Sequence, residues 1–372
     1  MKIEWSHQDE IPEGPVKVYS ALFLKYAPGS LISNVQTTFK VLRVSPEIYF
    51  PVTINDTEWK NSFVCSPYTA YALYSRDELR RKINNKLLRF IIRFLIRMVS
   101  KLLRWGAINK NVHINNFLLS TNPYPDWDGE FVDQVTSFIS LQYPGHAIIF
   151  RSLNQHQHNR IICKLKQHKY RLIGSRQVYI YDQNIGDWKN HNNNRQDKRI
   201  IKNKKLVYLG HDEMEPYLEE ALLLYQRLYL EKYSYYNPQF TFSYFEECHK
   251  NNIIIFQGYR DGNNQLKAFS GIFVVENTIT SPLVGYDTHA PKNEALYIHA
   301  IQSIFDYKFR TGKILNLSSG APRFKRLRGG KPSIEYSAVY TSHLNFKRRF
   351  IWNVLQLASN KVGVPLMKKY EL

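Results

Sequence analysis

A short apolar strand near the carboxyl end of the chain is followed by a turn of small and cationic residues, 318–330. The candidates for ligand binding in this turn are Ser318, Ser319, Gly320, Arg323, Arg326, Arg328 and Gly329. Small residues let a ligand approach the backbone, and Arg suits phosphate or carboxylate groups. We therefore expect the turn to hold a phosphorylated acyl or aminoacyl donor. The alternative interpretation is a basic surface turn.

Charge stabilisation and proton transfer require further residues. Lys325, in the same turn, is a candidate for stabilising the charge of a tetrahedral intermediate. Asp287 is a candidate base or amine binder, although an Asp at this place also suits a helix cap. Glu335 and Tyr336 are neighbours on a predicted strand, so their side chains point to opposite faces and at most one of them faces a ligand. These four residues form the predicted catalytic set.

Polar residues at the ends of predicted strands supply candidates for binding an acceptor. They are Arg151, Asn154, Ser175, Arg176, Tyr286 and Thr288. Ligands often lie at strand ends in layered α/β domains. The same residue types also build turns, which is the alternative interpretation.

The hydrophobic pattern predicts the strands and helices that would position these residues. Residues 15–75 favour strands and turns, with a hairpin formed by 35–44 and 48–54. A βαβ-like unit is predicted in 146–182, and residues 184–205, rich in Asn, Lys and Arg, are expected to form an exposed loop. The carboxyl-terminal part is predicted to follow the order helix, three strands, helix, strand, basic turn, strand, helix. The expected fold class is α/β (α+β), with helices packed on a mixed sheet.

Residues 77–105 give the strongest helical signal, and cations recur within them at three- or four-residue spacing. The basic stripe, in the segment 82–104, consists of Lys82, Lys86, Arg89, Arg93, Arg97, Lys101 and Arg104. No apolar run approaches 18 residues, so we do not expect this segment to span a membrane. Three interpretations stay open: a domain helix with a solvated basic face, a docking surface for an acidic carrier or nucleic acid, and a helix lying on an anionic membrane surface.

The composition limits the class of protein. The chain has 372 residues, of which 44% are hydrophobic, and its formal net charge is +20. This length indicates two domains. The charge favours an anionic partner, such as a nucleic acid, an acidic carrier protein, a membrane surface or a phosphorylated ligand. The alternative is a basic host proteome with solvated Lys and Arg.

Cysteine usage and motif content exclude several classes. Three widely spaced cysteines and a polar, acidic amino terminus without the features of a signal peptide favour a cytoplasmic location, with peripheral contact with a membrane left open. No P-loop, dinucleotide fingerprint, CxxC pair or Ser-His-Asp order supports an ATPase, a redox enzyme or a hydrolase. His156, His158, Cys163 and His168 match no usual zinc spacing, so no metal is expected.

The carboxyl-terminal third resembles the FemAB-like (BioF2-like) proteins of the GNAT acyltransferase fold. The resemblance rests on the predicted strand-and-helix order and on residues 283–288, 316–330 and 335–344, with a Phe-Lys-Arg sequence, a short spacer and Gly. It implies two tandem GNAT-like domains, which we place at 1–212 and 213–372. In acetyl-CoA-using GNAT enzymes a glycine loop precedes the helix that follows the antiparallel meander of three strands. Residues 287–294 occupy this place in the chain and contain no glycine. Pyrophosphate capture at that helix is therefore not supported.

The resemblance implies an N-acyltransferase that transfers an acyl or aminoacyl group from a thioester or ester to an amine. The donor would be a co-substrate, either acyl-CoA, acyl-carrier protein or aminoacyl-tRNA, with no tightly bound cofactor. The alternative is a non-catalytic module on a GNAT-like scaffold that binds nucleic acid or a membrane surface through the segment 82–104.

Overall fold

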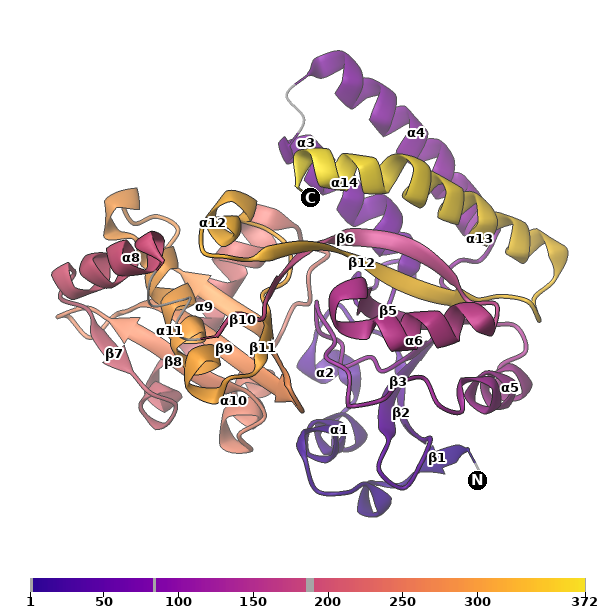
Figure 1. The fold of residues 1–372 in the computed structure, drawn as a ribbon, viewed down its shortest axis with the longest axis horizontal. Helices are drawn as coiled ribbons and strands as arrows, with labels where there is room; N and C mark the ends of the chain where they lie inside the picture. Colours follow the sequence, from indigo (N-terminus) through magenta and orange to yellow (C-terminus); the bar gives the residue numbers. More distant parts are fainter. Residues whose placement is uncertain (1–2, 83–84, 185–190, 372) are drawn as a thin grey trace. The chain divides into compact units, whose positions relative to one another are not determined.

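The chain folds into two compact units, which we describe separately. The computed structural model describes residues 3–82, 85–184 and 191–371 (Figure 1). Unit 1 combines residues 1–177, 236–238 and 333–372, and unit 2 combines 178–235 and 239–332. The expected boundary between residues 212 and 213 falls inside unit 2, and as a boundary between two GNAT-like domains it stays a prediction.

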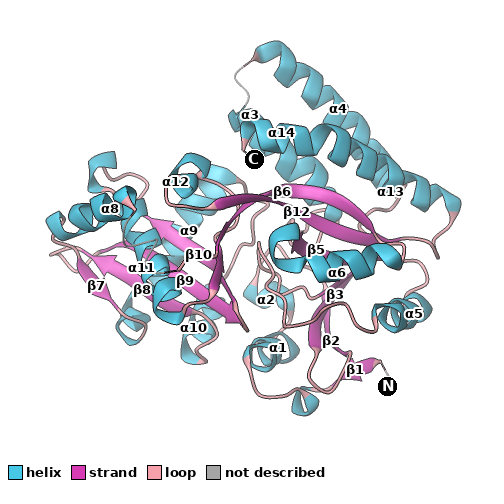
Figure 2. Cartoon of the chain, viewed as in Figure 1, coloured by secondary structure: helices cyan, strands magenta, loops and turns pink. Residues whose placement is uncertain are grey.

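Unit 1 contains a mixed sheet with the strand order β1-β2-β3-β4-β5-β12-β6 (Figure 2). The strands are β1 (Glu4–Ser6), β2 (Thr38–Arg43), β3 (Tyr49–Asn55), β4 (Asn111–Ile114), β5 (Ala147–Asn154), β6 (Arg171–Tyr181) and β12 (Lys331–Tyr340). The β4–β5 pair is parallel, whereas β5 and β12 pair antiparallel. The predicted hairpin is confirmed, because β2 and β3 pair antiparallel.

Alternate residues of β5 separate the two hydrophobic cores of unit 1. The helices of this unit are α1 (Pro15–Lys25), α2 (Pro28–Leu31), α3 (Ser75–Lys82), α4 (Lys86–Trp105), α5 (Val132–Gln142), α6 (Gln155–Gln167), α13 (Phe346–Ala358) and α14 (Val364–Tyr370). Ile148 and Phe150 belong to the core that includes residues of α5 and α6. Ile149 belongs to a second core with Leu103 of α4 and Trp352 of α13.

Unit 2 contains a sheet with the order β6-β11-β10-β9-β8-β7, to which β6 contributes its last residues. The other strands are β7 (Val207–Leu209), β8 (Ile255–Arg260), β9 (Leu266–Val275), β10 (Thr278–Tyr286) and β11 (Ile314–Asn316). The helices are α8 (Asn192–Asn203), α9 (Leu218–Tyr225), α10 (Phe242–Lys250), α11 (Leu296–Thr311) and α12 (Pro322–Arg326). The predicted meander is confirmed by the antiparallel pairs β8–β9 and β9–β10.

The two faces of the unit 2 sheet pack against different helices. Ala268 and Ile272 of β9 belong to the core formed with α11. Phe269 points to the opposite face, where its ring centroid lies 6.1 Å from that of Phe245 on α10. Gly285 of β10 lets α9 approach closely, because a Cβ there would lie 2.8 Å from the carbonyl carbon of Leu224.

Two sequence-based predictions of local structure are wrong. Residues 15–25, expected within a region of strands and turns, form α1, which starts with Pro15 at its first position and buries Tyr19, Leu22 and Phe23 on one side. Residues 192–203, expected to lie in an exposed loop, form α8. Its Asp197 is buried and binds a guanidinium of the basic turn, a contact that the local sequence does not reveal. Residues 185–190 of the expected loop lie outside the described residues.

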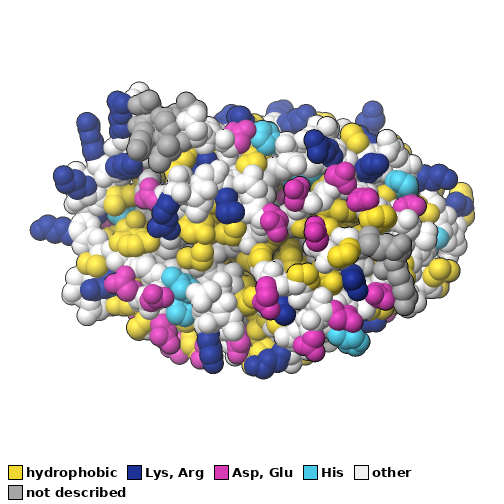
Figure 3. Space-filling model, turned by 60° about the horizontal axis from the view of Figure 1, so that its bottom comes forward, with side chains coloured by type: hydrophobic (Ala, Val, Ile, Leu, Met, Phe, Trp, Pro, Cys, Tyr) yellow, Lys and Arg dark blue, Asp and Glu magenta, His cyan; other side chains and the backbone are white. Residues whose placement is uncertain are grey.

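The segment predicted as a long basic helix forms α3 and α4, on either side of residues 83 and 84, which are not described. Within the described residues, no helix combines the length and the apolar content needed to cross a membrane. On the face of the molecule shown in Figure 3, basic and acidic side chains are interspersed with apolar ones.

Candidate functional site

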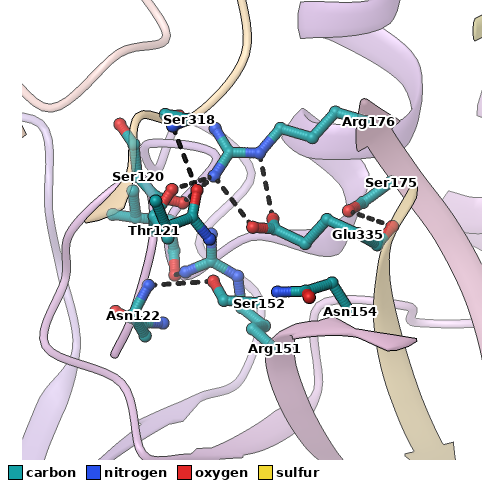
Figure 4. A network of polar contacts seen from close by, with 12 residues as sticks. Ser120, Thr121, Asn122, Arg151, Ser152, Asn154, Ser175, Arg176, Ser318 and Glu335 are labelled. Atoms are coloured by element: carbon teal, nitrogen blue, oxygen red, sulfur yellow. Dashed lines mark hydrogen bonds and ion pairs between the residues drawn. The ribbon is translucent and has the colours of Figure 1, made fainter. Parts of the chain in front are cut away.

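Glu335 and Arg176 form a buried ion pair in unit 1, on the neighbouring strands β12 and β6. Only 2% of Glu335 is exposed. Arg176 donates from Nε to Oε1 of Glu335 at 2.9 Å and from Nη2 to Oε2 at 3.3 Å (Figure 4). The Nη2 atom also donates to the Thr121 hydroxyl at 2.7 Å and to the Ser120 carbonyl oxygen. This two-pronged geometry fixes the carboxylate in one orientation.

Arg151, on β5, places a second cation near this pair. It is 8% exposed and donates from Nη1 to the backbone oxygen of Val64 and to Oδ1 of Asn116. Burial lowers the pKa of Arg151 to about 10, and the negative charge of Glu335 opposes this shift. The guanidinium is therefore still protonated at neutral pH. Unit 1 thus holds the buried Arg151, the half-buried Arg176 and one buried carboxylate in the same region.

These three charged side chains line one pocket, which we call the unit 1 pocket. Its polar lining residues are Tyr71, Tyr74, Ser75, Glu78, His113, Arg151, Ser175, Arg176, Glu335 and Ser337. The cavity volume is about 50 Å³, which holds several waters or the end of one polar group. The pocket therefore has room for the reacting end of a substrate rather than for a whole cofactor.

The lining also holds buried polar atoms without a hydrogen-bond partner among the residues described, and these include Nδ1 of His113 and Nε1 of Trp352. Each such atom costs about 1–3 kcal/mol when it is left unsatisfied, so a ligand or water in the pocket would stabilise both. Burial and the positive charge of Arg151 hold the pKa of His113 well below its usual range, so the ring is neutral. Burial raises the pKa of Tyr71 to about 12, so its phenol keeps its proton.

The pocket brings together four residues that the sequence singled out: Arg151, Ser175, Arg176 and Glu335. The Ser175 hydroxyl donates to the backbone oxygen of Glu335 at 3.0 Å, so Ser175 helps hold the β12 backbone.

The other candidates in unit 1 lie elsewhere. Asn154 caps α6, where its Oδ1 accepts a hydrogen bond from the Gln157 amide at 2.9 Å. This contact agrees with the alternative interpretation, in which such residues build turns rather than bind an acceptor. Tyr336 follows Glu335 on β12 and does not line this pocket. Burial raises the pKa of its phenol.

Sequence reasoning missed six of the ten polar residues named above, and Ser337 and His113 illustrate why. Ser337 could have been found from the two-residue period of a strand, which places it on the same face as Glu335. His113 lies on the four-residue strand β4, and no local signal links it to β12.

In unit 2, the turn that follows β11 is held by an internal ammonium group. Ser318, Gly320 and Ala321 have positive φ values of 57°, 83° and 48°. Lys325 is 3% exposed, and its Nζ donates to the backbone oxygens of Leu317 at 2.6 Å, Ser318 at 3.2 Å and Ser319 at 2.7 Å. Lys325 therefore stabilises the turn itself, and its catalytic role stays a prediction.

The cations of the basic turn differ in exposure. Arg328 is buried and donates from Nε and Nη2 to the two carboxylate oxygens of Asp197 at 2.5 and 2.6 Å. Its guanidinium carbon also lies 3.5 Å from the ring centroid of Phe324. Arg323 and Arg326 are exposed. Gly329 has a φ of 82°, and its oxygen accepts from the Gln183 side chain. Donor binding by this turn stays a prediction, and the exposed arginines are its accessible cations.

The third candidate group lies at the end of β10. Asp287 accepts from the His289 amide at 3.0 Å, and its carboxylate lies 3.9 Å from Arg227 and from Lys267. The Tyr286 hydroxyl accepts from Nζ of Lys232 at 3.0 Å. Thr288, in the turn after β10, is half-buried. Asp287 thus stabilises the turn after β10 and is not the cap of a described helix, because Pro291 and Ala295 hold the N-cap positions of the next two helical segments. Its role as a base stays a prediction.

The described part of the chain brings together no group of three or more His, Cys, Asp or Glu residues that could hold a metal.

Comparisons with known proteins identify the fold. No protein-family model and no curated protein matches the chain. Among solved structures, FemX matches with a TM-score of 0.51 and 8% identity, over 96% of this chain and 100% of FemX. A tandem GNAT protein from the clavulanic acid biosynthesis pathway has a TM-score of 0.41 and 8% identity, over 89% of this chain and 90% of its own. L-PGS from Bacillus licheniformis has a TM-score of 0.41 and 14% identity, over 61% of this chain and 77% of its own.

The match to FemX extends over nearly the whole chain and agrees with the mixed sheets of the two units. The chain therefore has the fold of FemX, a mixed α/β fold, in agreement with the fold class expected from the sequence.

Proposed function

We propose that the protein is an acyl- or aminoacyl-transferase that acts on an amine, and that the unit 1 pocket receives the amine end of the acceptor. The observation that supports this best is the cluster of the buried Glu335 and Arg151 with the half-buried Arg176 around a small cavity. A buried carboxylate beside a buried and a half-buried cation is a costly arrangement for a core. Groups with a shifted pKa, such as Arg151, concentrate at functional sites.

In this proposal the neutral amine attacks the carbonyl carbon of the donor. A C–N bond forms, the C–O or C–S bond of the ester or thioester breaks, and one proton leaves the nitrogen. Glu335, held in place by Arg176, accepts that proton and passes it to the leaving oxygen or sulfur, because a positioned carboxylate can act as a general base and then as a general acid. The positive charge of Arg151 stabilises the oxyanion that develops on the carbonyl oxygen of the donor. Placing the two reacting groups in contact supplies the rest of the rate enhancement.

The donor is proposed to be a co-substrate, either acyl-CoA, acyl-carrier protein or aminoacyl-tRNA, and no tightly bound cofactor is needed. Ser318, Ser319 and Gly320, with the exposed Arg323 and Arg326, are the proposed contacts of its phosphate groups. Arg323 and Arg326 suit a phosphorylated donor, because each guanidinium offers paired N–H groups to phosphate oxygens. Lys325 and Arg328 support this turn from inside.

The test is transfer of a radiolabelled acyl or aminoacyl group to a panel of primary amines. The donors are acetyl-CoA, acyl-carrier protein and aminoacylated total tRNA, and the acceptors are amino acids, amino sugars, short peptides and an aminophospholipid. Glu335→Gln is expected to lower kcat by about 10²–10⁴ through loss of the base. Arg151→Lys is expected to lower it by about 10²–10³, because the guanidinium geometry is lost.

The matched control is Glu47→Gln, an exposed carboxylate in the turn between β2 and β3, which should keep wild-type activity. Melting temperatures show whether each variant is folded, because Glu335→Gln leaves Arg176 without its anionic partner. Wild-type turnover by folded Glu335→Gln would exclude this carboxylate as the base. If no donor in the panel supports transfer while the protein still binds RNA or vesicles, the non-catalytic alternative would replace the transferase.

A further inference from the structure

Helix α4 carries an apolar face that the hydrophobic core does not use. Its residues Ile96, Val99, Leu102 and Leu103 pack in the core of unit 1. Six other large apolar side chains on the same helix are between 45% and 69% exposed: Leu87, Phe90, Ile91, Phe94, Met98 and Trp105. Scattered exposed apolar residues are normal, whereas a contiguous group marks an interaction surface.

The six exposed side chains form a single stripe. Leu87, Phe90, Phe94 and Met98 follow one another at three- and four-residue intervals, Ile91 lies four residues after Leu87, and Trp105 lies seven residues after Met98, so the six share one side of the helix. The helix has 20 residues and is therefore about 30 Å long. A stripe of this length requires an extended apolar partner.

Cations lie along the same helix, and no acid accompanies them. Residues 86–105 include Lys86, Arg89, Arg93, Arg97, Lys101 and Arg104 but no Asp or Glu. By helical spacing these cations occupy a stripe that adjoins the exposed apolar one. Arg93 and Arg97 also line a cavity of about 300 Å³ together with Arg76 and Ser100. Three guanidinium groups around one cavity suit a phosphate group.

Helix α13 extends this surface. It contacts α4 (Figure 1), and the ammonium of its Lys347 lies 4.1 Å from the ring centroid of Trp105. Phe346 and Phe350 on α13 are 75% and 48% exposed. Residues 346–370 again contain cations but no acidic residue. Both helices thus present apolar side chains next to positive charge.

We propose that the α4–α13 surface, defined by these exposed residues of α4 and α13, binds an anionic phospholipid bilayer. The apolar stripe enters the boundary between headgroups and acyl chains, and the cations contact lipid phosphates. An amphipathic helix with this division of residues lies in the plane of a bilayer. A nucleic acid would satisfy the cations but would leave Leu87, Ile91 and Met98 exposed, because a polynucleotide backbone offers these aliphatic side chains no apolar partner.

The test is flotation of the full chain with phosphatidylcholine vesicles that contain or lack phosphatidylglycerol. We expect binding to the anionic vesicles, little binding to the neutral ones, and weaker binding as salt is raised. Arg93→Gln with Arg97→Gln should lower the partition coefficient by about 25-fold, at about fivefold for each cation near the surface. Leu87→Ser with Phe90→Ser and Phe94→Ser should lower it by about a hundredfold or more.

Two matched controls carry the same changes elsewhere on the protein. Leu141→Ser with Leu223→Ser removes exposed apolar side chains of α5 and α9, and Arg160→Gln with Lys166→Gln removes exposed cations of α6. Both controls should bind like wild type, and melting temperatures should show that all variants are folded. Soluble glycerol phosphate at a concentration equal to that of the lipid should not displace the vesicles.

Four outcomes would overturn the proposal. They are absence of binding to anionic vesicles, equal loss in the control variants, full displacement by glycerol phosphate, and tighter binding of tRNA or an acidic carrier protein that requires the same α4 residues. The measurement needs no substrate turnover, so its failure is independent of the proposed transferase activity.

Discussion

At the scale of single residues, the basic turn shows how similar side chains differ in role. Lys325 is buried and donates to three backbone oxygens, whereas Arg323, two residues earlier, is exposed. Buried carbonyl groups without donors are costly. These three hydrogen bonds therefore account for a buried lysine at position 325 without any role in catalysis.

We expect Lys325→Met to lower the free energy of unfolding by about 2–4 kcal/mol, because three carbonyl groups lose a charged donor. Arg323→Ala in the same turn is the control and should change it by less than about 0.5 kcal/mol, since this side chain is exposed. Urea unfolding of the two variants measures both values. A Lys325→Met variant with wild-type stability but no transfer activity would instead support the catalytic role that the sequence predicts.

The sequence alone identifies four of the ten polar residues named for the unit 1 pocket. Arg151, Ser175, Arg176 and Glu335 were all candidates, and all four line it. From side-chain chemistry alone, Arg151, Ser175 and Arg176 are predicted to bind an acceptor and Glu335 to take part in catalysis. Arg176 and Glu335 are 159 residues apart in the chain, and only the order of the strands, with β12 between β5 and β6, shows that they meet. A single sequence does not reveal this pairing.

At the scale of elements, strongly patterned segments were predicted well, and polar ones were not. The meander β8–β9–β10 and the βαβ-like unit β5–α6–β6 form where alternation and apolar periodicity are clear. Helix α8 has a polar sequence that resembles a loop. It is stabilised by the buried ion pair between Asp197 and Arg328, whose partners lie 131 residues apart. Such a helix depends on tertiary contacts rather than on its own hydrophobic pattern.

We expect Asp197→Asn to lower the free energy of unfolding by about 3–5 kcal/mol, because it leaves the buried guanidinium of Arg328 without a charged partner. Lys202→Gln removes an exposed charge from the same helix and should be nearly neutral. Thermal and urea unfolding of both variants provide the comparison. Replacing Asp197 and Arg328 together by Leu and Met should cost less than Asp197→Asn alone. Equal stability of Asp197→Asn and Lys202→Gln would show that α8 contributes little to unit 2.

At the scale of the whole molecule, unit 1 is assembled from both ends of the chain. Its sheet includes β12, contributed by residues after Pro332, between β5 and β6. The length of the sequence predicts two units. Their boundaries are harder to predict, because a shift in composition or a linker marks only the ends of a domain formed by one continuous segment. The return of the carboxyl-terminal segment to unit 1 therefore has no signature in the local sequence.

We expect a fragment of residues 1–212 to lack cooperative unfolding, because it lacks β12 and the packing of Trp352 in the second core. The full chain, purified in the same way, is the reference. Circular dichroism melting and the dispersion of amide signals in NMR spectra measure the difference. A cooperative transition in the 1–212 fragment would show that this segment is an independent domain, as its predicted boundary implies.

The late position of β12 also determines when each unit can be completed during translation. Unit 2 needs no residue beyond Pro332, whereas unit 1 begins first and needs the last 40 residues of the chain. At roughly 5–20 residues per second, the ribosome takes roughly 8–30 s to pass from Gln177 to Ser333. For most of this interval β5 and β6 have been synthesised but the strand that lies between them has not. The unit that is synthesised first is therefore the last to be completed, and its exposed strand edges need protection for longer than those of unit 2.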